Sequence, residues 1–105
     1  MNATTLSALA EPSRLRIVEL LREKPYPVGR IAKRLVLRQP QVSKHLRVLR
    51  EAGLVDVRPT AQQRIYQLRA KPFKELDSWL ETFRRIWDKR LDSLEAYLQE
   101  LKETQ

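Results

Sequence analysis

The side chains best suited to chemistry in this chain lie in one short polar segment. They are two amides, a hydroxyl and two cations within nine residues, namely Gln39, Gln41, Ser43, Lys44 and Arg47. A glutamine amide can bond adenine N6 and N7 at once, whereas hydroxyl and cationic groups bind phosphate oxygens. The two glutamines are therefore candidates for reading bases in a DNA major groove, and Ser43 and Lys44 are candidates for holding the DNA backbone.

Each of these side chains also has an ordinary explanation. Glutamines at the start of a helix are often simply solvated, and Ser43 and Lys44 could be plain surface residues. His45 adjoins the apolar stripe of the segment, so a buried structural role and a DNA contact are both open. Arg47 and Arg50 could form a solvated helix face, although Arg47 lies near enough for contact with a DNA backbone.

The apolar residues around these groups predict the helix that positions them. Val42, Leu46 and Leu49 follow one another at i, i+4 and i+7, the spacing of one buried helical stripe. Pro40 suits the first turn of a helix, and Gly53 is the usual left-handed terminator. Because the polar side chains lie off the buried stripe, this segment is predicted to be a DNA recognition helix.

Three shorter helices are predicted before the recognition helix. Their ranges are 4–9, 12–23 and 28–35, and prolines between the second and third prevent a continuous helix. A brief turn at 36–38 leads into the recognition helix. Two short helices joined this closely, with the polar face on the second, describe a helix-turn-helix.

A β-hairpin is predicted after the recognition helix. Residues 54–57 and 65–68 are rich in β-forming side chains and flank the turn-like stretch 59–63. A hairpin that follows a helix-turn-helix is a wing, and its cations can reach a phosphate backbone or a minor groove. The predicted wing contacts are Arg58, Gln62, Gln63 and Arg64.

The last third of the chain is predicted to be one long helix over residues 72–101. Its apolar residues step by three or four throughout, and its thirty residues would span ~45 Å. A helix that long and that apolar exceeds what one small domain can cover, so a partner chain is its natural cover. Its aromatic residues could instead line a ligand pocket between subunits, although helical spacing favours packing. The predicted dimer contacts on this helix are Phe73, Leu76, Leu80, Phe83, Trp87, Leu91, Leu94, Leu98 and Leu101.

The charge distribution favours a polyanionic partner for the first two-thirds of the chain. The 105 residues carry a formal net charge of +8. Residues 1–70 hold 14 Lys and Arg against 5 Asp and Glu, whereas residues 71–105 hold 7 against 8. We therefore expect a single domain over residues 1–105, with a DNA-binding core and wing in 1–70 and a dimerisation helix in 71–105.

Composition narrows the cellular environment and the class of function. The absence of cysteine excludes disulfides and thiolate metal sites, and we expect neither a signal peptide nor a membrane span. A cytoplasmic protein with no membrane partner is the expectation. The sequence has no nucleophile–base pair beyond what its lone histidine could offer, no phosphate loop and no paired-carboxylate motif. We therefore expect no enzymatic activity, no catalytic residues and no cofactor.

Three functions are compatible with these features. The favoured one is a homodimeric, sequence-specific regulator bound to double-stranded DNA. The alternatives are a non-specific nucleic-acid-coating or architectural protein and a protein-interaction winged helix whose long helix docks a partner. The polar recognition face argues against the coating protein, and the excess of cations in residues 1–70 argues against the interaction module.

The chain resembles the ArsR-type winged-helix transcriptional repressors, named for the arsenical-resistance operon repressor, over nearly its full length. The matching segments are ALAEPSRLRIVELL (8–21), VGRIAKRL (28–35), QPQVSKHLRVLREAGLV (39–55) and RIYQL (64–68). The string V-S-x-H-L followed by L-x-x-A-G-L-V is fairly specific among helix-turn-helix proteins.

The resemblance implies a fold, a partner and site residues. The fold would be mainly α with a β-hairpin, a winged helix-turn-helix of order α-α-α-α-β-β-α, dimeric through its first and last helices. The first helix would add Leu6 and Leu9 to the dimer contacts. The protein would bind an inverted-repeat operator and repress its own operon. The residues that would face DNA match Gln39, Gln41, Ser43, Lys44 and His45.

The sequence departs from the family in three places. Metal-sensing members carry a cysteine pair where this chain has Pro27, Val28 and Gly29, and the other known metal site needs histidines on the last helix, whereas the only histidine is His45. We therefore expect no metal site, and any small-molecule effector is unknown. The wing tip lacks the usual glycine. Arg38 stands where the family often has a Ser or Thr helix cap, which adds a cation at the DNA end.

Overall fold

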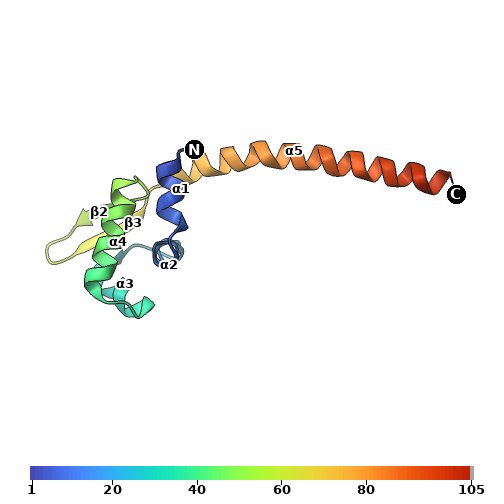
Figure 1. Ribbon diagram of the computed structural model, residues 1–105. Helices are drawn as coiled ribbons and strands as arrows, with labels where there is room; N and C mark the ends of the chain where they lie inside the picture. Colours follow the sequence, from blue (N-terminus) through green and yellow to red (C-terminus); the bar gives the residue numbers. More distant parts are fainter. Residues whose placement is uncertain (105) are drawn as a thin grey trace. The chain divides into compact units, whose positions relative to one another are not determined.

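The computed structural model describes residues 1–104 and divides the chain into two compact units, Met1–Phe73 and the remainder from Lys74 onward. The predicted succession of four helices, a hairpin and a long last helix is confirmed, with one short strand added. The elements in chain order are α1 (Ala3–Ala10), α2 (Pro12–Leu21), β1 (Tyr26–Pro27), α3 (Val28–Leu35), α4 (Gln39–Glu51), β2 (Val55–Pro59), β3 (Arg64–Leu68) and α5 (Ala70–Glu103) (Figure 1).

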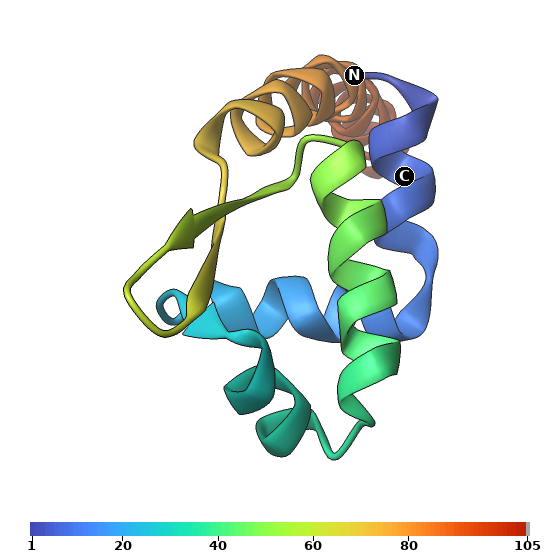
Figure 2. The same cartoon turned by 90° about the vertical axis from the view of Figure 1, so that its left-hand side faces the viewer.

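The apolar stripe of α4 lies at the centre of the core of the first unit. Val42, Leu46 and Leu49 are 0, 1 and 0% exposed, as their spacing predicts. Ile17 of α2 and Ile31 of α3 are fully buried in the same cluster. Figure 2 shows α4, in green, beside the hairpin of β2 and β3. Since burying one such side chain contributes ~1.5–3 kcal/mol, this cluster fixes α4 against α2 and α3.

Two helices end in the same left-handed motif, although only one of them ends at a glycine. After α4, Gly53 has φ 80° and the next N–H donates to the carbonyl of Leu49 at 2.9 Å. After α3, Val36 has φ 56° and the next N–H donates to the carbonyl of Ala32 at 3.0 Å. This is the Schellman motif, and the glycine terminator predicted at Gly53 is confirmed. A β-branched side chain is strained in this region, and at 89% exposure Val36 gains little packing in return.

The sheet has three strands in the order β1-β3-β2, whereas two were predicted. β2 and β3 form the predicted antiparallel hairpin. β1 adds a short antiparallel pairing in which Tyr26 lies opposite Tyr66. The prolines on both sides of Tyr26 were used only to exclude a continuous helix, and proline is tolerated at the edge of a sheet. This extra pairing joins the segment before α3 to the wing.

The wing tip at residues 60–63 closes without glycine. The N–H of Thr60 donates to the carbonyl of Gln63 at 2.7 Å, and the N–H of Gln63 donates to the Thr60 hydroxyl at 3.2 Å. Within residues 1–104, only Val36 and Gly53 have a positive φ. Because no tip residue occupies the left-handed region, the tip does not need the glycine that the family usually has there.

The ends of three helices differ slightly from the predicted ones. α1 runs from Ala3 to Ala10 rather than over 4–9. α2 ends at Leu21 rather than at 23, just before its sequence turns polar. α5 begins at Ala70 rather than at 72 and ends at Glu103 rather than at 101. The first four N–H groups of a helix have no intrahelical acceptor, so Pro72 fits within the first turn instead of marking its start.

In the second unit, α5 exposes most of its large apolar side chains. Their exposed fractions run from 36% for Trp79 to 58% for Trp87. Trp79 and Phe83 pack edge to face, with ring centroids 5.0 Å apart. None of the helices in residues 1–104 combines the length and the hydropathy required to cross a bilayer. A contiguous apolar face of this kind marks an interaction surface.

Replacing Val36 by glycine should raise the free energy of unfolding. The change removes left-handed strain of ~1–2 kcal/mol from the folded state. Glycine also raises the conformational entropy of the unfolded chain, which costs ~0.5–1 kcal/mol, so the net gain in stability is about 0.5–1 kcal/mol. Urea denaturation of the purified protein would measure this gain. As a matched control, Gly53→Val should lower the free energy of unfolding by at least ~1 kcal/mol. A loss of stability in Val36→Gly would contradict the assignment of strain at this position.

Candidate nucleic-acid interface

The polar face of α4 lies in solvent along its whole length. Its five predicted contact residues are all exposed, namely Gln39, Gln41, Ser43, Lys44 and Arg47. The helix begins after Arg38, whose side chain makes no capping bond. Instead, Gln41 Oε1 accepts the N–H of Arg38 at 3.4 Å, which is a long hydrogen bond. The amide NH₂ of Gln41 is therefore left to donate to another acceptor.

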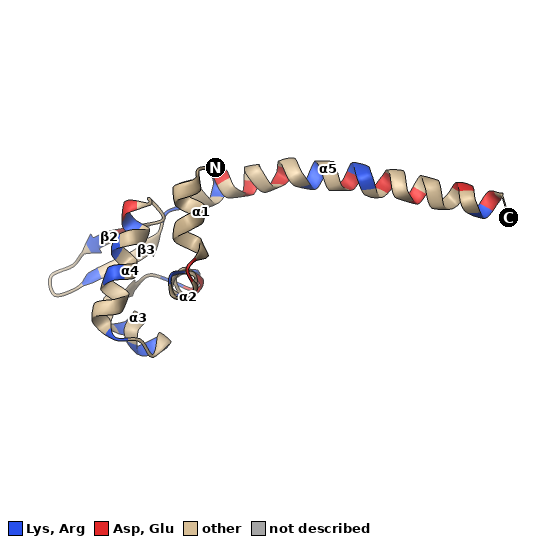
Figure 3. Ribbon diagram, viewed as in Figure 1, with Lys and Arg blue, Asp and Glu red and all other residues tan. Residues whose placement is uncertain are grey.

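Most cations of the first unit fall into two groups according to their contacts. Arg14, Arg16 and Arg34 donate to oxygen atoms of the unit itself, at 2.7, 2.8 and 3.2 Å. Arg14 joins α2 to α1, Arg16 joins α2 to α3, and Arg34 joins α3 to Tyr26 of β1. A second group lies on α3, on α4 and on the wing (Figure 3). These have neither an ion pair nor a side-chain hydrogen bond within residues 1–104, and they include Arg30, Lys33, Arg38, Lys44, Arg58 and Arg64.

Arg47 belongs to neither group. Its Nε lies 3.3 Å from Glu51 Oε1, one helical turn further along α4. The two side chains are 82 and 68% exposed, and an exposed pair of this kind contributes only ~0.3–0.5 kcal/mol. A phosphate oxygen could therefore replace Glu51 at small cost, so Arg47 is available to a nucleic acid.

His45 lies against the start of α2. Its Nδ1 is 3.7 Å from Glu11 Oε2, and its side chain is 23% exposed. The Glu11 carboxylate also accepts the N–H of Arg14 at 2.8 Å and so caps α2. That hydrogen bond, assisted by His45 and opposed by desolvation, holds the pKa of Glu11 below its ordinary value of 4.5. His45 thus links the recognition helix to α2, which favours its structural role over a direct contact with DNA.

The predicted wing residues are all exposed. Arg58 in β2 and Arg64 in β3 flank the tip, while Gln62 and Gln63 lie within it. The backbone of Gln63, and not its side chain, closes the tip. All four side chains are thus presented to an outside partner by a hairpin whose conformation is fixed by main-chain and threonine bonds.

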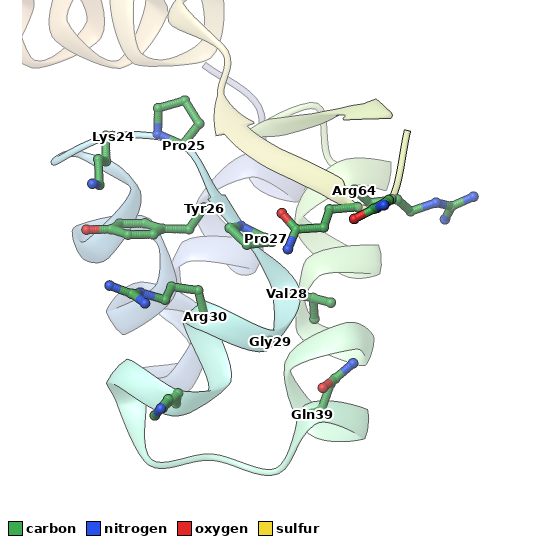
Figure 4. Close-up of a pocket in the computed structure, with 12 residues that line it drawn as sticks. Lys24, Pro25, Tyr26, Pro27, Val28, Gly29, Arg30, Gln39 and Arg64 are labelled. Atoms are coloured by element: carbon green, nitrogen blue, oxygen red, sulfur yellow. The ribbon is translucent and has the colours of Figure 1, made fainter. Parts of the chain in front are cut away.

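A groove of about 770 Å³, here called the wing groove, lies between the wing and α3 (Figure 4). Arg64 and the tip glutamines line one side, and β1 with the first turn of α3 lines the other. Gln39 of α4 reaches the same groove. The groove therefore joins recognition helix, α3 and wing into one surface, and none of its lining residues is acidic.

Sequence reasoning missed three cations of the wing groove as contact residues. Arg30 and Lys33 are exposed on α3, but nothing in the sequence placed them beside the wing. That proximity depends on the pairing of β1 with β3, which was not predicted. Lys24 lies in the same groove, with Nζ 5.4 Å from the centroid of the Tyr26 ring.

The predicted dimer contacts divide into an exposed set and a partly buried set. Leu9 and Phe73 pack against the core of the first unit, and Leu6 and Leu76 are also partly buried. The exposed set lies on α5 and consists of Leu80, Phe83, Trp87, Leu91, Leu94, Leu98 and Leu101. Most of the large apolar side chains that are exposed in the described chain therefore lie on α5.

Metal-ligating side chains do not gather anywhere in the described part of the chain. Within residues 1–104, no group of three or more His, Cys, Asp and Glu side chains is placed to hold a metal ion. Positions 27–29, which correspond to the cysteine-bearing segment of metal-sensing members, lie at the junction of β1 and α3.

Comparison with known proteins identifies relatives among bacterial DNA-binding regulators. The sequence model described as "Bacterial regulatory protein, arsR family" matches residues 11–57, from the cap of α2 into β2. The HTH-type transcriptional regulator Rv2034 of Mycobacterium tuberculosis is 40% identical over 84 residues, which cover 80% of this chain and 76% of that protein. The Biofilm growth-associated repressor of Agrobacterium fabrum is 44% identical over 66 residues, which cover 63% of this chain and 56% of that protein.

A solved structure extends the similarity to the fold. It is the homodimeric winged helix-turn-helix DNA-binding domain of a possible ArsR-family transcriptional regulator from Mycobacterium bovis. Its TM-score is 0.66 at 26% identity, over 76% of this chain and 74% of that chain. The winged helix-turn-helix fold expected from the sequence is thereby confirmed.

Replacing Glu11 by glutamine should lower stability at neutral pH and have less effect in acid. Because folding lowers the pKa of this carboxyl group, ionised Glu11 stabilises the fold above its unfolded-state pKa. That contribution is lost as the pH falls through the lowered pKa of the folded state. Urea denaturation at a series of pH values should show a stability difference between wild type and Glu11→Gln that closes in acid. A difference independent of pH would contradict the role of the ionised carboxylate.

Proposed function

Because the chain belongs to the arsR family of bacterial regulatory proteins, we propose that it is a homodimeric repressor that binds an inverted-repeat operator through α4 and the wing. The observation that carries this proposal is the two-sided character of α4. One face is 0–1% exposed in the core, and the other presents two amides, a hydroxyl and cations to solvent. Such a helix is held rigidly while its polar groups are available to base edges and phosphates.

The groups of the interface divide between base reading and backbone binding. Gln39 and Gln41 are the base-reading residues of the proposal, because an amide supplies both a donor and an acceptor to adenine. Arg38, Ser43 and Lys44 contact phosphates beside them, as does Arg47 when it leaves Glu51. The wing and the wing groove bind the flanking backbone through Arg58, Gln62, Gln63, Arg64, Arg30, Lys33 and Lys24.

The exposed apolar face of α5 supports the homodimer. A second copy of the same helix offers a complementary apolar surface, and a two-fold dimer presents two recognition helices to an inverted repeat. The similar domain from Mycobacterium bovis is described as homodimeric. The Agrobacterium relative is described as a repressor, which agrees with occlusion of a promoter as the mode of action. In this proposal, regulation does not use the metal sites known in the family.

Substitutions in α4 and in the wing should separate base reading from backbone binding. Gln41→Ala should cost ~1–3 kcal/mol per half-site on the operator and relax the preference at one base position, because a bidentate contact is lost. Arg64→Ala should weaken operator and random DNA to a similar extent. Binding selection from random DNA would supply the operator, and fluorescence anisotropy on both DNAs would measure the changes.

Salt dependence supplies a second measurement on the same complexes. About three to five phosphate contacts per subunit should give a slope of log K against log salt of about −5 to −9, and Arg64→Ala, which removes one contact from each subunit, should flatten it by about two. Gln41→Ala should leave the slope unchanged. Should Gln41→Ala weaken random DNA as much as the operator, the coating-protein alternative would replace the repressor.

A charge on the apolar face of α5 should dissociate or unfold the dimer. Leu94→Asp would bury an unpaired carboxylate at ~3–5 kcal/mol per copy. Sedimentation velocity at micromolar concentration would report the change in mass. Ala96→Asp is the matched control, because two residues along a helix turn the new charge roughly 200° away from Leu94. A wild-type protein that sediments as a monomer at this concentration would disprove the dimer.

A further inference from the structure

A second cationic hollow, of about 400 Å³, lies between α4 and β3 and is here called the helix–wing pocket. Ser43, Arg47 and Arg50 line it from one face of α4, because they stand at i, i+4 and i+7. Arg64 and Tyr66 line it from β3. Three arginines and two hydroxyl-bearing residues from two different elements therefore line one space, and the rest of its lining, Val28 and Leu46, is apolar.

The positive charge of the helix–wing pocket is poorly compensated. Arg50 and Arg64 have no ion-pair partner within residues 1–104. Arg47 has only its exposed pair with Glu51, and no carboxylate contributes to the lining. Three guanidinium groups around one hollow repel one another until an anion lies between them, and their planar forks match phosphate oxygens two at a time.

We propose that the helix–wing pocket binds a free phosphorylated anion of the size of pyrophosphate or larger. Its volume falls within the range of about 300–1,000 Å³ that is usual for small-molecule sites. A DNA backbone phosphate offers the same chemistry, but it approaches as part of a thick sugar-phosphate strand. Tyr66 is only partly exposed, so a small anion reaches this side chain more readily than a strand does.

Occupation of the pocket would compete with DNA. Three residues that line the pocket also contact the DNA backbone in the proposed operator complex, namely Ser43, Arg47 and Arg64. An anion held among them withdraws these groups from the duplex, so the ligand acts as an inducer that releases the repressor. This release rests on the proposed function, whereas the binding of the anion to the DNA-free protein does not.

The first arm of the test uses the DNA-free protein and sodium pyrophosphate at constant ionic strength, with sodium chloride as the reference salt. Backbone amide NMR shifts should move saturably around Ser43, Arg50 and Tyr66, with half-saturation below about 1 mM. Arg50→Gln should weaken pyrophosphate binding at least tenfold. Lys89→Gln, which removes the same charge from α5, should leave it unchanged. Absence of a saturable shift, or equal loss in both variants, would overturn the proposal whether or not the protein binds DNA.

The second arm measures operator affinity with and without pyrophosphate at matched ionic strength. Saturating pyrophosphate should weaken operator binding at least fivefold in the wild type and less than twofold in Arg50→Gln, which itself should bind the operator within threefold of wild type. If Arg50→Gln weakens all DNAs alike and pyrophosphate shifts no amide, the pocket serves the DNA backbone and the proposal is wrong. A protein that binds pyrophosphate but no specific DNA would refute the repressor and retain the pocket.

Discussion

Burial of three side chains on α4 determines which groups the helix can offer to a partner. With Val42, Leu46 and Leu49 enclosed by α2, α3 and the start of the hairpin, the helix has no freedom to rotate about its axis. A rotation large enough to hide Gln41 would drive one of these leucines into water, at a loss of ~1.5–3 kcal/mol. The polar face is therefore oriented by the core before any ligand arrives, and little binding energy is needed to order it.

The contacts of the cations show a second division that charge alone does not reveal. Several arginines are used inside the first unit, as in the bond from Arg14 to the last carbonyls of α1. Others have no internal partner and lie around the recognition helix and the wing. A net charge counted along the sequence mixes the two kinds. Cations without an internal partner are free to replace the counterions condensed on a polyanion, and Arg47, whose pair with Glu51 is exposed and weak, can join them.

Local patterns predicted most of the helices, and long-range pairing explains what they missed. The spacing of Val42, Leu46 and Leu49 and the terminator Gly53 suffice for α4, because both are properties of adjacent turns. The strand β1 was missed because its two residues, Tyr26 and Pro27, follow another proline and give almost no local signal. They form a strand only because they pair with β3 across the sheet. The same omission hid the nearness of Lys24 and Arg30 to the wing. The polar residues of α4 and the wing were predicted to be accessible and are exposed, whereas their contacts with DNA are still predictions.

The closure of the wing tip has a consequence for how relatives of this protein could diverge. Thr60 supplies the bonds that hold the tip, and neither Ala61 nor Gln62 occupies a conformation that demands a particular residue. Those two positions can therefore accumulate substitutions without loss of the hairpin, while the α4 stripe cannot. Substitutions at these two positions would therefore change the side chains that the tip offers to a DNA backbone, while the bonds between Thr60 and Gln63 keep the hairpin closed.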